Sequence, residues 1–255
     1  FELFCCHENK GWQELLRRQL GLPGLWSRYF SSKRELRDYD IPYPVVLKTL
    51  TGSNSRGVFL VQDEKQLLSR IRSLEPALGL GQRLDLLRRR YLRKPRSYPG
   101  FPDYTNLTDY HQYRDYITME LPFILQEFVP ALNFDYRVVG LGDRFYASKR
   151  LTRKGDFRAS GAKRFDFDFT PPSRVLDYAC ELKRLIHAPF LSIDLGECED
   201  GQLQLFEFQA LHFGINTILL SRGWYEREGE NWIFCEGRTE IEAALARGLD
   251  QFLTE

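Results

Sequence analysis

The sequence has 255 residues, of which 43% are hydrophobic, 28% charged and 14% aromatic. This composition is typical of a globular protein and excludes disorder, collagen-like sequence and low complexity. With 36 basic and 35 acidic residues, the formal net charge is only +1, so no global field draws the chain to nucleic acid or lipid.

The cysteine pattern and the length of the apolar runs indicate the cellular compartment of the protein. Five cysteines without a CxxC pair indicate free thiols in a reducing environment. Cys5, Cys6 and His7 could suggest zinc, but no second ligand pair lies at zinc-finger spacing. No apolar run approaches the roughly 18 residues of a membrane helix, and no secretory signal opens the chain. We therefore expect a cytoplasmic protein without membrane contact, and the start at Phe1 leaves open a longer parent chain.

The first half of the chain alternates helical and extended patterns. Apolar spacing predicts an amphipathic helix over 11–20, and the glycine-rich segment 51–57 separates two predicted strands, 43–50 and 57–61. A helix is expected over 63–74.

An insert is expected over about 77–120. Its segment 83–96 holds seven basic side chains, with Leu84, Leu87 and Tyr91 on one predicted helical stripe. The simplest interpretation is a solvated helix, and the alternative is a docking site for RNA or an acidic partner. Residues 98–116, rich in Tyr, Pro and Asp, are expected to form a long loop.

The second half combines strand and helix signals. Strands are expected within 121–129, 136–141 and 144–151, followed by a polar stretch over 152–165. An apolar stripe after Pro171 and Pro172 predicts a helix, two strands follow over 189–195 and 203–209, and a helix ends the chain. Because strands and helices mix without βαβ alternation, we expect an α+β fold. Neither a dinucleotide-binding glycine fingerprint nor a Walker motif is present.

The hairpin over 190–209 is the sharpest chemical signal. If Asp200 and Gly201 form a two-residue turn, residues whose numbers sum to 401 face one another, so Asp194 lies opposite Glu207. Paired carboxylates destabilise a sheet unless a cation neutralises them, and Gln209 offers a third oxygen on the same face. These oxygen donors suit Mg²⁺ or Mn²⁺ better than zinc.

Two alternatives remain open for that hairpin. The acids could lie on a solvated face, or the register could be slipped. We expect the leucines at 203 and 205 to share the face of the carboxylates, which would keep that face partly dry.

Lys48 precedes the loop that runs from Gly52 to Gly57. A lysine on an apolar strand beside a glycine-bracketed loop can place an ammonium group and backbone N–H groups around phosphates. The alternative is a protective lysine on an edge strand next to an ordinary turn.

Five segments, read in order, carry a resemblance to a known family. They are ENKGWQELL, KTLTGSNSRGVFL, QEFVPALNFDYRVVGL, ASKRLTRKGDFRAS and SIDLGECEDGQLQLFEFQ. In this order the chain resembles the ATP-grasp superfamily, and most closely its branch of ribosomal-protein glutamate ligases and acid–amino acid ligases. The resemblance spans most of the chain except the insert. It implies an ATP-grasp fold with two α+β lobes and the nucleotide between them: a helical segment 1–40, a lid lobe 41–128 with the insert 77–120, and a C-terminal lobe 129–255.

The resemblance also implies roles for individual residues. Lys10 and Lys48 would contact phosphates, and the loop with Gly52, Ser53 and Gly57 would close over them. Arg150 and Arg158 would face the reacting phosphoryl and acyl groups. The adenine hinge would be formed by Gln126, Glu127 and Phe128, and Asp135 would contact the ribose. The metal ligands would be Asp194, Glu207 and Gln209.

The implied activity is an ATP-dependent carboxylate–amine ligase that works through an acyl phosphate. Its substrates would be a carboxylate and an amine, from a small molecule or a peptide tail. The alternative is a catalytically silent ATP-binding regulatory or scaffold protein. Two departures from the family stand out. Gln209 stands where the family usually has Asn, and the residues before Lys10 cannot supply the α/β domain that usually helps to form the acceptor pocket. We therefore expect either an incomplete chain or a differently built substrate wall. Neither the acid, the amine nor the oligomeric state follows from the sequence.

Overall fold

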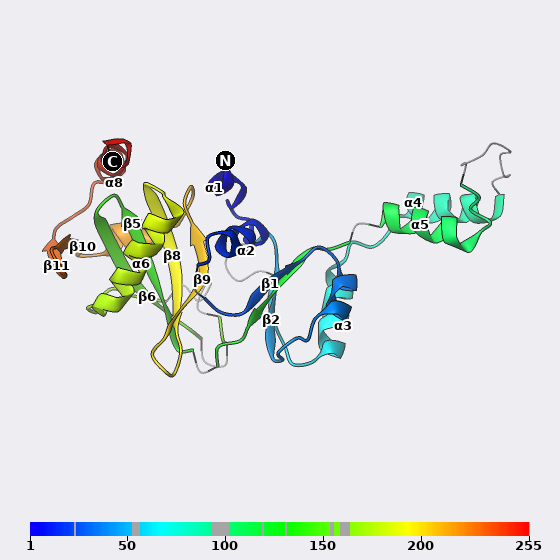
Figure 1. The fold of residues 1–255 in the computed structure, drawn as a ribbon, viewed down its shortest axis with the longest axis horizontal. Coiled ribbons are helices and arrows are strands. Elements are labelled where there is room, and N and C mark those ends of the chain that lie inside the picture. The colour runs from blue at the N-terminus through cyan, green and yellow to red at the C-terminus, as the bar shows by residue number, and fades with distance from the viewer. Residues whose placement is uncertain are drawn as a thin grey trace. The chain divides into compact units, whose positions relative to one another are not determined.

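The structure is a computed structural model that describes residues 1–22, 24–52, 57–92, 102–118, 120–130, 132–153, 156–158 and 164–254. The chain forms two compact units (Figure 1). Unit 1 comprises 1–29, 42–61 and 123–255, and unit 2 comprises 30–41 and 62–122. The lobe boundaries expected at residues 40 and 128 stay a prediction.

A large antiparallel sheet is the centre of unit 1. Within the described residues its strand order is β11-β10-β6-β5-β8-β9, and β7 pairs with β6. The strands are β5 (Phe134–Leu141), β6 (Arg144–Leu151), β7 (Phe165–Asp166), β8 (Phe190–Glu197), β9 (Leu203–Gln209), β10 (Gly223–Glu228) and β11 (Asn231–Glu236). The strands expected at β5, β6, β8 and β9 are confirmed, whereas the β10–β11 hairpin was not expected from the sequence.

A smaller sheet has the order β1-β4-β2-β3. Its strands are β1 (Ser27–Phe30), β2 (Val45–Thr49), β3 (Val58–Val61) and β4 (Phe123–Glu127). The helices of unit 1 are α1 (Glu2–Cys5), α2 (Lys10–Gln19), α6 (Ser173–Ile186), α7 (Asn216–Leu220) and α8 (Ile241–Thr254). The helices expected at α2, α6 and α8 are confirmed. Among the described residues, no helix is long and apolar enough to cross a membrane.

The two faces of the large sheet differ because side chains alternate along each strand. Helix α6 covers one face, where Val175 and Leu182 share a buried apolar cluster with Val138, Ile193 and Leu195. Each such side chain contributes about 1.5–3 kcal/mol when it is fully buried. The residues between them in the strands point to the other face, which is therefore the face that carries the polar side chains of β5, β6 and β8.

The β8–β9 hairpin contains two irregularities that the sequence did not predict. The expected two-residue turn is wrong: Gly201, at φ +80°, closes a three-residue loop in which Cys198 N donates to the Gln202 carbonyl. This loop moves the register by one residue, so Glu197 pairs with Leu203.

A β-bulge then moves the register back. Phe206 is the extra residue, since Leu195 pairs with Leu205 while Asp194 pairs with Glu207. The facing pair predicted from the sequence is therefore confirmed, although the two shifts that produce it cancel. Leu205 was expected on the same face as the carboxylates, and this expectation is wrong. Because of the bulge, Leu205 packs in the apolar cluster under α6, on the opposite face.

Unit 2 is mainly helical within the described residues. Its elements are η1 (Lys33–Asp38), α3 (Glu64–Leu74), α4 (Leu80–Leu87), the π-type turn η2 (Arg88–Leu92) and α5 (Leu107–Ile117). The helix expected at α3 is confirmed. The long loop expected over 98–116 is wrong, since Asn106 accepts a hydrogen bond from Thr108 N and caps α5.

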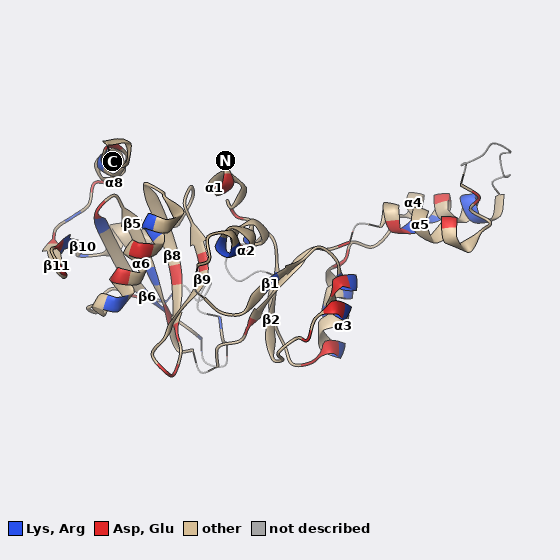
Figure 2. Cartoon of the chain, viewed as in Figure 1, with Lys and Arg blue, Asp and Glu red and all other residues tan. Residues whose placement is uncertain are grey.

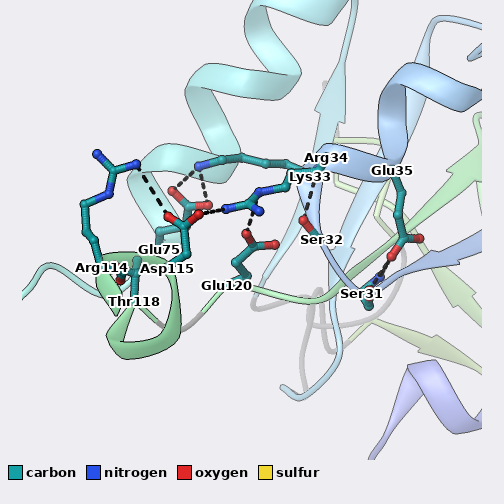
Figure 3. Close-up of polar contacts among 10 residues, drawn as sticks. All are labelled: Ser31, Ser32, Lys33, Arg34, Glu35, Glu75, Arg114, Asp115, Thr118 and Glu120. Carbon is teal, nitrogen blue, oxygen red and sulfur yellow. Dashed lines mark hydrogen bonds and ion pairs between the residues drawn. The ribbon is translucent and has the colours of Figure 1, made fainter. Parts of the chain in front are cut away.

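Acidic and basic residues lie along α3 (Figure 2), and charged side chains join η1 to the rest of unit 2 (Figure 3). Arg34 forms ion pairs with Asp115 at 2.7 Å and Glu120 at 3.0 Å, and Lys33 contacts Glu75 at 2.6 Å. The hydrogen bond from Arg34 lowers the pKa of Asp115. These pairs are partly exposed, so each contributes little to stability, but together they orient the end of α5 within the unit.

Candidate functional site

Both sheets of unit 1 line one open pocket, which encloses a cavity of about 120 Å³. The lining residues are Lys10, Val46, Lys48, Gly52, Val58, Gln126, Glu127, Phe128, Val129, Leu132, Asp135, Arg150, Phe157, Arg158, Asp194, Phe206 and Glu207.

One part of the pocket lining is apolar. Phe128 and Phe157 meet edge to face with their ring centroids 5.8 Å apart. Val46, Val58 and Leu132 also line the pocket. Such a lining suits a flat, weakly polar ring, because ring faces pack against aliphatic and aromatic side chains without losing hydrogen bonds to water.

Two lysines supply positive charge to the same pocket. The backbone of Lys10 donates to the Leu50 carbonyl at 2.9 Å, and its Nζ donates to the Gly52 carbonyl at 2.7 Å. Lys10 Nζ also lies 4.0 Å from Glu207 Oε1. Burial lowers the pKa of the Lys48 ammonium to about 8, with Lys10 adding to this effect and Glu207 opposing it.

A buried chain of alternating charges lies on the polar face of the large sheet. Arg150 donates two hydrogen bonds of 2.6 Å to Asp135, and its Nη2 lies 2.8 Å from Asp194 Oδ2. Arg137 donates two further bonds, of 2.8 and 2.9 Å, to Asp194. Burial alone would raise the pKa of Asp194, but Arg137 and Arg150 outweigh it and hold the pKa at about 2.

Burial raises the pKa of Asp135 to about 6, although Arg150 opposes the shift. Both carboxylate oxygens of Asp135 are bonded to Arg150. In the structure Asp135 contacts Arg150, and the ribose contact expected for Asp135 stays a prediction.

The metal ligands expected from the sequence carry oxygen atoms, which are the ligand atoms that Mg²⁺ and Mn²⁺ prefer. Asp194 and Glu207 are cross-strand neighbours, and Gln209 Nε2 donates to Glu207 Oε1 at 3.1 Å. Asp194 already accepts three bonds from arginines, but each carboxylate oxygen has two lone pairs, so Oδ1 keeps room for another ligand. Within the described ranges, no group of three His, Cys, Asp or Glu side chains is placed to hold a metal. The side-chain oxygen of Gln209, the third ligand expected from the sequence, accepts a hydrogen bond from Glu8 N at 3.4 Å.

The glycine loop is described only at its ends. Gly57 has φ +75°, and an added Cβ would lie 2.0 Å from Thr49 Oγ1, so a larger residue does not fit. Gly57 does not line the pocket, whereas Gly52 does. Ser53 lies outside the described residues.

The expected hinge segment leaves β4 at the pocket wall. Gln126 is buried, and the Glu127 backbone N donates to the Trp26 carbonyl at 2.8 Å. Gln126, Glu127 and Phe128 all line the pocket. The hinge role of these three residues stays a prediction.

Arg158 reaches the pocket from the chain between β6 and β7. It donates bonds of 2.8 and 2.9 Å to Asp156, and this carboxylate raises the pKa of Arg158. Among the described residues, its contact with a strand is a weak one of 3.4 Å to the Val58 carbonyl, and its side chain is more exposed than that of Arg150.

Of the site residues named from the sequence that the structure describes, the pocket gathers all except Gly57 and Gln209. Sequence reasoning missed Arg137, the second partner of Asp194, and the apolar lining residues Leu132, Phe157 and Phe206. Arg137 could have been found, because it lies two residues after Asp135 on the same strand and therefore shares its face. Phe206 could not, since it lines the pocket only through the bulge.

No protein-family model and no curated protein matches the sequence. Solved structures match the fold. N5-carboxyaminoimidazole ribonucleotide synthetase in complex with ADP superposes with a TM-score of 0.54 at 13% identity, over 87% of this chain and 49% of that chain. The ATP-grasp ligase PsnB in complex with precursor peptide PsnA2 and AMPPNP superposes with a TM-score of 0.52 at 14% identity, over 96% of this chain and 58% of that chain.

An L-amino acid ligase from Bacillus licheniformis gives a TM-score of 0.50 at 14% identity, over 84% of this chain and 45% of that chain. The chain therefore spans about half the length of the solved structures that it matches. These similarities establish an ATP-grasp α+β fold, as the sequence predicted.

Proposed function

We propose that the chain is an ATP-dependent carboxylate–amine ligase. The observation that carries the proposal is one pocket in which an apolar lining and a group of lysines and arginines occur together. A nucleoside triphosphate has the matching chemistry, with a flat base at one end and a polyanion at the other. The ATP-grasp fold supports the same class of ligand.

Each group in the pocket has a role in this proposal. The base lies among Phe128, Phe157 and Val58, while Lys10 and Lys48 contact the phosphates. Phosphoryl transfer depends mainly on charge neutralisation and positioning, so the chemistry needs no side-chain nucleophile. Asp194, Glu207 and Gln209 would hold Mg²⁺ or Mn²⁺, which when bound would further neutralise the phosphate charge.

We expect the reaction to proceed in two steps. An oxygen of the substrate carboxylate attacks the γ-phosphorus of ATP, and the bond to the β–γ bridging oxygen breaks, which releases ADP and leaves an acyl phosphate. The amine nitrogen then attacks the acyl carbon, phosphate leaves, and the amine loses a proton. Arg150 neutralises the transferred phosphoryl group, and Arg158 stabilises the oxyanion of the tetrahedral intermediate.

The substrates are a carboxylate and an amine, from a small molecule or a peptide tail. PsnB, one of the similar structures, is bound to a precursor peptide. This complex supports a peptide as one substrate class for a chain of the same fold. The finer assignment, to the branch of ribosomal-protein glutamate and acid–amino acid ligases, rests on the sequence motifs.

One observation favours a second candidate, a nucleotide-binding regulatory or scaffold protein without turnover. Arg137 and Arg150 already neutralise Asp194, so a metal has to share this carboxylate with two guanidinium groups. A protein that retains the pocket but not the metal geometry binds ATP without releasing ADP.

The test uses the full chain with Mg·ATP and mixtures of amino acids, dicarboxylates and peptides. We expect ADP release that requires both a carboxylate and an amine, with mass spectrometry identifying the amide. ATP binding without ADP release in any mixture supports the second candidate. Absence of ATP binding contradicts both.

The pKa of Lys48 predicts a pH dependence of nucleotide binding. Because this pKa is about 8, Lys48 is charged at pH 7 and mostly neutral at pH 9. If the bound lysine stays protonated, the affinity for ADP falls about tenfold over this interval. Isothermal titration with ADP measures the change. The Lys48→Arg variant stays charged throughout and should lose this dependence, so an equal slope in both proteins would rule out the assignment.

A further inference from the structure

Helix α4 and turn η2 of unit 2 expose an apolar stripe. Leu80, Leu84, Leu87 and Tyr91 follow one another at spacings of four, three and four residues, and each is more than half exposed, the least being Leu87 at 53%. This spacing places them on one side of a helix. The sequence predicted the stripe at Leu84, Leu87 and Tyr91, and the structure shows that it does not pack into a core.

The opposite side of the same helix is anchored within unit 2. Leu86 is buried, and the Arg89 guanidinium lies 4.1 Å from the ring centroid of Tyr113 and 5.2 Å from that of Tyr104. Arg89 Nε donates to Asp85 at 2.6 Å, and chiefly for this reason the pKa of Asp85 is lowered to about 2. The stripe is therefore presented on a helix whose orientation is already held by its other side.

Arginines flank the stripe. At 100° per residue, Arg83 and Arg88 lie about 70° to either side of its centre. Both are exposed, although Arg88 also donates to Asp85 at 2.7 Å. The segment from Leu80 to Leu92 holds four arginines and one aspartate, which gives a net charge of +3 on a chain whose total is +1.

We propose that this face is a docking surface for an acidic amphipathic helix of a partner protein. Apolar residues of the partner pack on the leucine stripe, and its flanking carboxylates pair with Arg83 and Arg88, as e and g charges do in coiled coils. Guanidinium groups bind carboxylates through two parallel hydrogen bonds, which gives the pairing geometric specificity. A second copy of this chain does not fit, because two faces of the same charge repel.

The test uses the full chain and two synthetic peptides of about three heptads, both with leucine at positions a and d. One has glutamate at positions e and g, and its twin has lysine. Fluorescence anisotropy measures both affinities, and circular dichroism reports that each variant is folded. We expect the acidic peptide to bind at least about tenfold more tightly than its twin.

Two variants separate the apolar and charged contributions. Leu84→Asp with Leu87→Asp should weaken binding of the acidic peptide at least about tenfold, whereas Leu253→Asp, at an exposed leucine of α8, should not. Arg83→Glu with Arg88→Glu should reverse the preference, so that the lysine peptide binds more tightly.

Several results would overturn this proposal. They are absence of binding by the acidic peptide at millimolar concentration, equal affinity for both peptides, or an unchanged preference after charge reversal. Tighter binding to single-stranded RNA or to phosphatidylserine vesicles than to the acidic peptide would assign the surface to a different partner. None of these results depends on ligase activity.

Discussion

Replacing Arg150 with alanine should lower the free energy of unfolding by about 3–5 kcal/mol, the cost of breaking a buried ion pair by removing one partner. The side chain of Arg150 is only 6% exposed and bonds to both Asp135 and Asp194. Its removal leaves Asp135 without its cation in the interior. Thermal unfolding followed by circular dichroism should show a decrease in Tm of about 6–20 °C.

Arg158→Ala is the matched control, because Arg158 lines the same pocket but is 36% exposed and, within the described residues, forms its ion pair with Asp156. Its removal should change the free energy of unfolding by no more than about 1 kcal/mol. Equal losses for the two variants would contradict the buried charge chain. Arg150→Met, which retains most of the volume, separates lost charge pairing from lost packing.

Replacing Glu207 with glutamine should lower the rate of ADP release on the order of 10²-fold, with the fold retained. Glutamine keeps the shape of the side chain but removes the charge that faces Asp194 and Lys10. The Glu207 side chain is 31% exposed and its contact with Lys10 is long, so the loss of stability should be small. Steady-state ADP release and thermal unfolding separate the two effects.

Glu197→Gln is the control for this prediction. Glu197 lies at the end of β8, where it accepts a hydrogen bond from Tyr136 on the side of the sheet that faces α6. Its turnover should stay within about twofold of the unmodified protein. If Glu207→Gln retained full turnover, the carboxylate pair would not be part of the catalytic site.

The structure also shows why the facing carboxylates could be predicted at all. The turn signal near Gly201 and the alternation of side chains are local properties, and both are visible in the sequence. The pairing of Asp194 with Glu207 nevertheless depends on two shifts, one in the loop and one at Phe206. The bulge at Phe206 has no strong local signal in the sequence. The predicted pair is correct because the shift in the loop and the shift at the bulge cancel.

Unit 2 shows the opposite case. The basic segment was recognised, but α5 was expected to be a loop, because its aromatic and acidic residues lack a clear helical period. Its helix forms with Asn106 as a cap and with Tyr113 packed against Arg89 and Tyr104. The Asn106 cap is a local signal, but the contact between Tyr113 and Arg89 joins separate segments, so a local pattern cannot report it.

By itself the sequence determined the α+β class, the order of the motifs and the residue types that the site requires, because strand alternation, helix caps and glycine turns depend on neighbouring residues. Only the tertiary structure decided that Arg137 and Arg150 share Asp194, that Phe206 lines the pocket and that Gly57 does not. Those arrangements depend on the register between strands that are distant in the chain, where a shift of one residue moves every side chain to the other face.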